Sequence, residues 1–89
     1  MRMLQNLRGV YLRRRDWARA VDTLDLLLLG APELSGLLKQ RGLLHMELKH
    51  FQAARRDLDR YLAMEPEAAD REEIRKQIRA IHTWLAKVN

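Results

Sequence analysis

The 89-residue chain contains no cysteine, which excludes disulfide bonds, zinc–thiolate sites and thiol nucleophiles. It has only two prolines and four glycines, and its 47% apolar and 33% charged residues fit one small, folded helical domain. No apolar run approaches the roughly 18–20 residues that span a bilayer. The N-terminal residues also lack the apolar core of a signal peptide. We therefore expect a cytoplasmic protein that does not bind membranes.

Side chains that could carry catalysis are few. The single serine, Ser35, stands at an expected helix start, where its simplest role is to cap the helix. His45 and His50 are five residues apart, about 140° around a helix, so a regular helix cannot turn both toward one metal ion. No glycine-rich phosphate loop is present in the sequence. We therefore expect no enzymatic activity, no metal and no cofactor.

Apolar residues recur with the period of an α-helix. Asp16 interrupts this pattern, and its carboxylate is placed to accept from the first backbone N–H groups of a following helix. The sequence therefore predicts two helices joined by a tight turn. Their apolar faces carry Leu4, Leu7 and Tyr11 in the first helix, and Ala20, Leu24, Leu27 and Leu28 in the second.

The same pattern returns 34 residues later. Each half ends in an acidic-flanked proline, a residue that stops a helix. Two helical hairpins of equal length indicate a stacked repeat, because one hairpin cannot bury its apolar face alone. The matched pairs are Leu4 with Leu38, Tyr11 with His45, Trp17 with Phe51, Ala20 with Ala54, Leu24 with Leu58, and Pro32 with Pro66.

These residues resemble the tetratricopeptide repeat, which has a 34-residue period. The resemblance implies an all-α fold, an α–α superhelix of two helical hairpins plus a C-terminal capping helix. The hairpins are repeat 1 over residues 1–34 and repeat 2 over residues 35–68, with the capping helix over 70–88. Together they form a single domain over residues 1–89.

The capping helix has its own signals. Asp70 and Glu73 form the pattern of a capping box, in which each side chain bonds a backbone N–H group at the helix start. One face is apolar and the opposite face is charged, as expected of a helix that covers the open end of a repeat stack. The apolar stripe consists of Ile74, Ile78, Ile81 and Leu85.

The first helix lacks a capping residue before Leu4, so we expect another segment to precede it in a longer protein. The amino-acid sequence of both repeats also resembles the C-terminal region of a bacterial family in which a transglutaminase-like domain precedes tetratricopeptide repeats. On that resemblance the chain is the repeat part of a larger protein. None of its residues carries transglutaminase-type chemistry.

The net charge of +5 raises the prospect of an acidic partner. Arg2 and Arg13 lie within about 20° of each other around the first helix. In the tetratricopeptide repeat family this side lines a concave groove, whereas the alternative is a solvated face without a ligand. Arg14 and Arg15 instead offset the partial negative charge of the helix end. The predicted groove residues are Arg2, Gln5, Leu12, Arg13, Lys39, Leu43, Met46 and Arg79.

Leu26 and Leu29 fall outside the apolar face of the second helix. They predict an outer contact with another domain or with a second copy in a homodimer. The alternative for Leu29 is packing beneath the next repeat. The function that we expect is a non-catalytic scaffold that binds a protein or peptide in the groove. A nucleic-acid-binding basic domain is the alternative, although the fold itself uses the aromatic residues that such binding favours.

Overall fold

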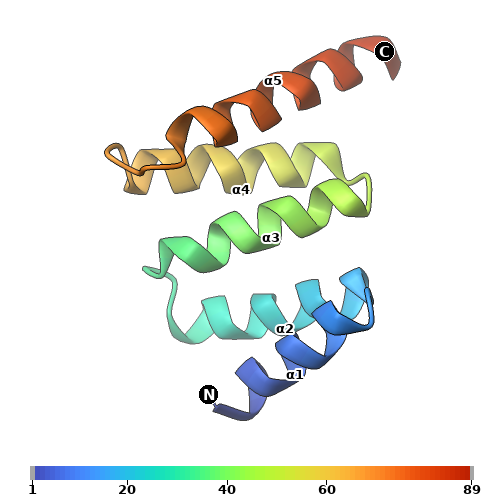
Figure 1. Cartoon of the computed structure of the whole chain (residues 1–89), viewed down its shortest axis with the longest axis vertical. Coiled ribbons are helices and arrows are strands. Elements are labelled where there is room, and N and C mark those ends of the chain that lie inside the picture. The colour runs from blue at the N-terminus through green and yellow to red at the C-terminus, as the bar shows by residue number, and fades with distance from the viewer. Residues whose placement is uncertain (1, 89) are drawn as a thin grey trace.

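Each described residue outside the turns lies in a helix. The structure is a computed structural model that describes the backbone of residues 2–88 and the side chains of residues 8–87. Helices adjacent in sequence pack against each other in chain order, with alternating directions (Figure 1). The predicted all-α fold of two hairpins and a C-terminal helix is confirmed. The helices are α1 (Arg2–Arg13), α2 (Trp17–Gly30), α3 (Ser35–Glu47), α4 (Phe51–Met64) and α5 (Arg71–Val88).

The turns inside the two hairpins have the same backbone conformation and the same backbone hydrogen bonds. Arg15 (φ 57°) and Lys49 (φ 63°), which are 34 residues apart, both adopt the left-handed conformation that ends many helices. The next N–H group then donates back across the helix end: Asp16 to the Tyr11 carbonyl and His50 to the His45 carbonyl, each at 2.8 Å. The backbone therefore follows the 34-residue period of the sequence.

The turns that follow the two hairpins also match each other. The N–H groups of Ala31 and Glu65 donate to the carbonyls of Leu27 and Tyr61 and close the ends of α2 and α4. Helix α2 ends two residues before Pro32 and α4 ends two residues before Pro66, as the sequence predicted. No helix within residues 2–88 is both long and apolar enough to cross a membrane.

The capping predictions had different outcomes. The Asp16 carboxylate accepts from the Arg19 N–H at 3.3 Å, so the predicted cap of α2 is confirmed. Asp70 precedes α5, but its two carboxylate oxygens accept from Lys39 and Tyr61 instead of from the first turn of α5. The capping-box prediction is therefore wrong, because side chains of α3 and α4 reach this carboxylate.

The core consists of two apolar clusters that meet at α3. The first joins α1, α2 and α3, and the second joins α2, α3, α4 and α5. Ala20 and Ala54, 34 residues apart, are completely buried where the helices of each hairpin cross. The predicted apolar stripe of α5 faces the second cluster: Ile74 and Ile81 are buried, and Ile78 and Leu85 are partly buried.

One glycine lets α3 and α4 approach each other closely. A Cβ atom added at Gly42 would lie 2.9 Å from Cγ and Cδ2 of Leu58, a side chain that is completely buried. The hairpin of α3 and α4 therefore has no room for a larger residue at this position. Gly36, on the same helix, has nothing within 4 Å of an added Cβ atom.

The two glycines make a matched pair for a stability test. We expect Gly42→Ala to lower the free energy of unfolding by about 1–3 kcal/mol, because the extra methyl group overpacks the core. Gly36→Ala should leave it unchanged or raise it by up to about 1 kcal/mol, since alanine favours helix formation. Urea denaturation followed by circular dichroism measures both. Equal stability of the two variants would contradict the close packing at Gly42.

Candidate functional site

One side of α3 remains open. Gly36, Gln40, Leu43 and Glu47 follow one another at spacings of four, three and four residues, which places them on a single stripe along the helix. Leu38 and Gly42 lie on the other side and are buried. The open stripe thus extends along most of α3, from its first turn to its last residue.

Three adjoining hollows follow this stripe, and we call them together the α3 groove. The first, about 440 Å³, lies beside the turn between α1 and α2 and includes Arg15, Trp17 and Leu43. The second, about 510 Å³, includes Arg8 and Glu33 and shares Gln40 with the first. The third, about 490 Å³, lies toward α5 and shares three residues with the second: Ser35, Gly36 and Glu65.

The predicted groove residues separate into four groups. Leu43 lines the first hollow and Lys39 the third. Leu12 and Met46 are half-buried and pack against the two core clusters. Arg13 and Arg79 are exposed and do not line the three hollows. Arg2 and Gln5 belong to α1, but their side chains lie outside the described residues. The binding role of all eight residues stays a prediction.

Several groove residues were absent from the predicted set. Trp17 was assigned to the fold alone, and Arg15 to the helix end. Both reach the groove because the left-handed turn at Arg15 brings the corner of α1 and α2 beside α3. Glu65 enters from the turn after α4, where its carboxylate accepts from the Ser35 hydroxyl at 2.8 Å. Only the stripe spacing within α3 signalled groove residues in the sequence.

A polar cluster forms one wall of the third hollow. Asp70 accepts from Lys39 Nζ at 2.7 Å and from the Tyr61 hydroxyl at 2.6 Å. The hydrogen bonds from Lys39 and Tyr61 hold the pKa of Asp70 below its usual range. The bond to Asp70, followed by burial, raises the pKa of Tyr61 to about 12. The cluster thereby joins α3, α4 and the turn before α5, and Asp70 balances the charge of Lys39.

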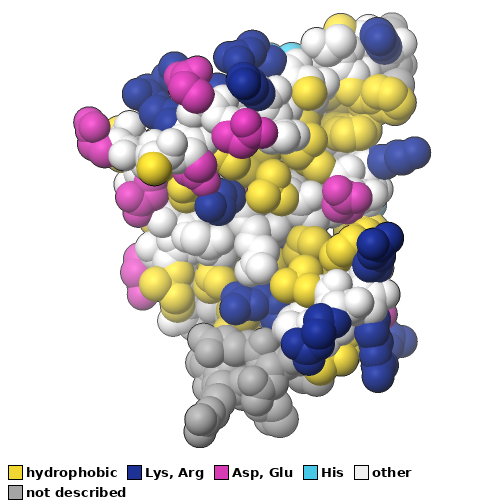
Figure 2. All heavy atoms as spheres, in the orientation of Figure 1, with side chains coloured by type: hydrophobic (Ala, Val, Ile, Leu, Met, Phe, Trp, Pro, Cys, Tyr) yellow, Lys and Arg dark blue, Asp and Glu magenta, His cyan; other side chains and the backbone are white. Residues whose placement is uncertain are grey.

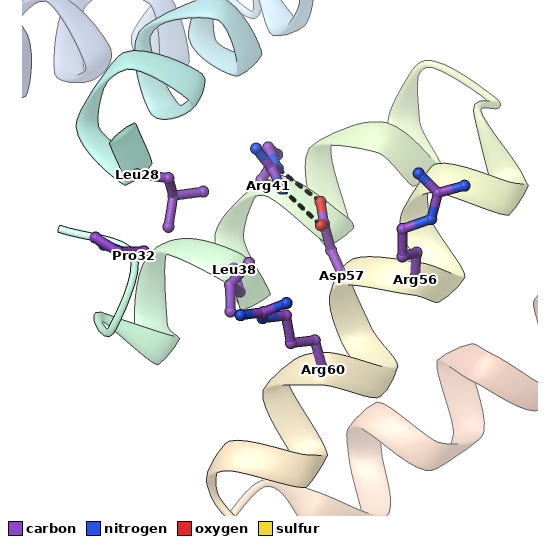
Figure 3. Close-up of a pocket in the computed structure, with 7 residues that line it drawn as sticks. All are labelled: Leu28, Pro32, Leu38, Arg41, Arg56, Asp57 and Arg60. Atoms are coloured by element: carbon purple, nitrogen blue, oxygen red, sulfur yellow. Dashed lines mark hydrogen bonds and ion pairs between the residues drawn. The ribbon is translucent and has the colours of Figure 1, made fainter. Parts of the chain in front are cut away.

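A second polar cluster lies on the opposite side of α3, beside a hollow of about 220 Å³ (Figure 3). Arg41 donates two hydrogen bonds to Asp57 and one to Asp25, all at 2.8 Å. The hydrogen bond to Asp57 is the main cause that raises the pKa of Arg41. This guanidinium therefore connects α2, α3 and α4.

His45 borders this cluster. Its Nε2 lies 3.9 Å from Asp57 Oδ2, and its buried Nδ1 has no hydrogen-bond partner within the described structure. Burial lowers the pKa of His45, and the neighbouring His50 and Arg41 lower it further, against the opposing effect of Asp57. His45 is thereby favoured in its neutral form. Among the side chains that the structure describes, no group of three potential ligands is placed to hold a metal ion.

The charge cluster predicts unequal effects of its two carboxylates. We expect Asp57→Ala to lower the free energy of unfolding by about 3 kcal/mol, because it leaves a half-buried guanidinium without its bidentate partner. Asp25 is largely exposed, so Asp25→Ala should cost less than about 1 kcal/mol. Chemical denaturation of both variants measures the difference. Similar losses would contradict the assignment of Asp57 as the main partner.

His45 predicts a pH dependence of stability. A histidine whose pKa is lowered by folding binds its proton better in the unfolded chain. The free energy of unfolding is therefore highest above about pH 6.5, the pKa of the histidine in the unfolded chain. It falls as the pH drops below that value. We expect His45→Gln to flatten this loss, whereas His82→Gln, at an exposed position, should leave it unchanged. Denaturation curves between pH 7.5 and about 5 provide the measurement. An unchanged slope in His45→Gln would contradict the inference.

A family model described as "Tetratricopeptide repeat" matches residues 7–79. Two curated relatives, each named "UPF0162 protein", come from two strains of Xylella fastidiosa, 9a5c and Temecula1. They are 39% and 38% identical over 66 residues, which is 74% of this chain but 24% of each relative. The matched part thus spans about a quarter of the relatives' length. No solved structure matches.

Proposed function

Because this chain belongs to the tetratricopeptide repeat family, we propose that it is a non-catalytic module that binds a protein or peptide segment in the α3 groove. Tetratricopeptide repeats generally mediate protein–protein interactions. The observation that carries the proposal is the continuity of the three hollows, which share lining residues along α3.

The shape of the groove supports an extended segment. Small-molecule sites are mostly enclosed and apolar, whereas these hollows adjoin along the open side of one helix and mix apolar with charged residues. The 13 residues of α3 give a length of about 20 Å. An extended chain covers that distance with about six residues. Leu43 and Trp17 then supply apolar contact, and Gln40 supplies hydrogen bonds at the centre.

The module fits a role inside a larger protein. Its curated relatives are about four times as long as the matched region. We propose that the module is the repeat part of such a longer protein, with a transglutaminase-like domain before it. We propose that Leu26 and Leu29 pack against a further domain or a second copy. The two side chains are 51% and 82% exposed on α2, so neither packs beneath the next repeat. A cytoplasmic location belongs to the same proposal.

Nucleic acid is the alternative partner, and the basic turns favour it. Arg13, Arg14, Arg15 and Lys49 are all exposed. Against it, Trp17 and Phe51 pack partly against the core, so that Trp84, which is 45% exposed, is the main aromatic ring left open for a base to stack on. Fluorescence anisotropy with a single-stranded oligonucleotide distinguishes the two partners. Tight binding that weakens steeply with salt would favour nucleic acid over peptide.

The peptide proposal predicts a position-specific loss of binding. A random 12-residue peptide library, selected on the protein, supplies the ligands. We expect Leu43→Lys to weaken the selected peptides at least tenfold, because it removes apolar contact and places a charge in the first hollow. Gln52→Lys adds the same charge on the exposed side of α4 and should leave the affinity unchanged. Isothermal titration calorimetry measures both, after circular dichroism has verified folding.

Amide chemical shifts provide the independent test of location. A peptide bound in the α3 groove should shift the amides of α3 and of the turn between α1 and α2 more than those of α4. Equal weakening by both variants, or shifts centred on α4, would overturn the assignment of the groove.

A further inference from the structure

The α3 groove has a basic end. Arg13, Arg14 and Arg15 stand at the turn between α1 and α2, and Lys49 stands at the matching turn between α3 and α4. All four side chains are exposed, and none forms an ion pair with another described side chain. Arg15 itself lines the first hollow.

The other end of the groove is acidic. Glu33 lies in the turn between α2 and α3, and Glu65 and Glu67 lie in the turn between α4 and α5. All three residues are exposed. Glu33 and Glu65 line the second hollow, and Glu65 also lines the third. The acidic residues therefore stand where α3 begins, and the basic residues stand where it ends.

The separation is visible on the face drawn in Figure 2, over α2 to α4. Lys and Arg side chains follow the right margin, where the turns inside the hairpins lie, and most Asp and Glu side chains lie toward the left; over α5, at the upper left, Lys and Arg side chains are present as well. Charges of the opposite sign reduce each end without reversing it. At the basic end Asp16 is paired with Arg19, and Glu47 is outnumbered by the four basic side chains. At the acidic end Lys39 is paired with Asp70, while Arg8, which lines the second hollow, and Arg71 are outnumbered by the three glutamates.

We propose, on the basis of the proposed function above, that the α3 groove selects a charge-segregated peptide segment and binds it in one orientation. The acidic part of the segment lies at the arginine turn, its apolar centre lies over Leu43 and Gln40, and its basic part lies beside Glu33 and Glu65. The partner is therefore not a uniformly acidic chain.

The distances make the two ends independent. The ends of α3 are about 20 Å apart, whereas the Debye length is about 8 Å at physiological ionic strength. Each end therefore interacts mainly with the charges directly above it. A uniformly acidic segment would gain attraction at the arginine turn and meet repulsion at the glutamates, while a segment of two signs gains at both.

Two peptides of identical composition test the inference. One has four glutamates, a Leu-Ala-Leu-Ala centre and four lysines; the other has the same centre between flanks of alternating Glu and Lys. We expect the segregated peptide to bind about tenfold more tightly, a difference of ~1.4 kcal/mol. The difference should disappear at about 1 M salt, where the Debye length is ~3 Å. Fluorescence anisotropy of labelled peptides measures both affinities.

Charge reversal at the basic end supplies the matched variant. Arg13→Glu with Arg14→Glu should reduce the affinity for the segregated peptide to that for the alternating one. Arg55→Glu with Arg56→Glu changes the net charge by the same amount on exposed residues of α4, away from the groove. This control pair should preserve the preference.

A nitroxide spin label shows the orientation. Placed on the glutamate end of the segregated peptide, the label should broaden the amide signals of the turn between α1 and α2, and not those of the turn between α4 and α5. Equal binding of the two peptides, or broadening at both turns, overturns the inference while the groove itself stands. Absence of binding by both peptides contradicts the inference, and the proposed function fails with it only if the library also yields no binding peptide.

Discussion

The ion pair of Arg41 with Asp57 is the interaction on which the arrangement of α3 depends. Asp57 is only 4% exposed, and a charge so far from water is tolerated only with a close partner and satisfied hydrogen bonds. The bidentate contact fixes the orientation of α3 against α4, and the third bond to Asp25 extends it to α2. Because Gly42 admits Leu58 beside it, the two helices approach closely enough for this contact.

The same arrangement determines which side of α3 remains open. Packing and the Arg41 cluster occupy the side toward α4, and Leu44 enters the cluster shared with α2. The bond between Lys39 and Asp70 places the start of α5 against the first part of α3. The remaining side carries Gly36, Gln40 and Leu43. These residues do not belong to the core, but the helix that carries them is fixed by its packing and by these ion pairs. A binding surface of this kind loses little entropy when a segment docks, because the helix is ordered in advance.

The fold was predictable from the sequence because the signals that define each helix lie within a few residues of one another. Apolar spacing within each helix, the alanines at the crossings and the prolines after each hairpin are all local signals, and the 34-residue register then relates one hairpin to the next. The groove was predictable only along α3, where Leu43 and Lys39 line it. Leu12 and Met46 share the side predicted for groove residues, yet both pack against the core clusters. For Met46 the reason is that α3 lies between α2 and α4 and buries more than one face.

Local spacing in the sequence encodes the helices found within residues 2–88, their order and the repeat that stacks them, because helix formation and hairpin length depend on neighbours a few residues apart. The charged residues, in contrast, take partners that only the packing of the helices brings within reach. Asp70 has the spacing of a capping residue but bonds Lys39 and Tyr61, and Arg41 reaches carboxylates 16 residues away in both directions. Long charged side chains choose partners by distance and burial in three dimensions, and no local spacing in the sequence encodes those distances.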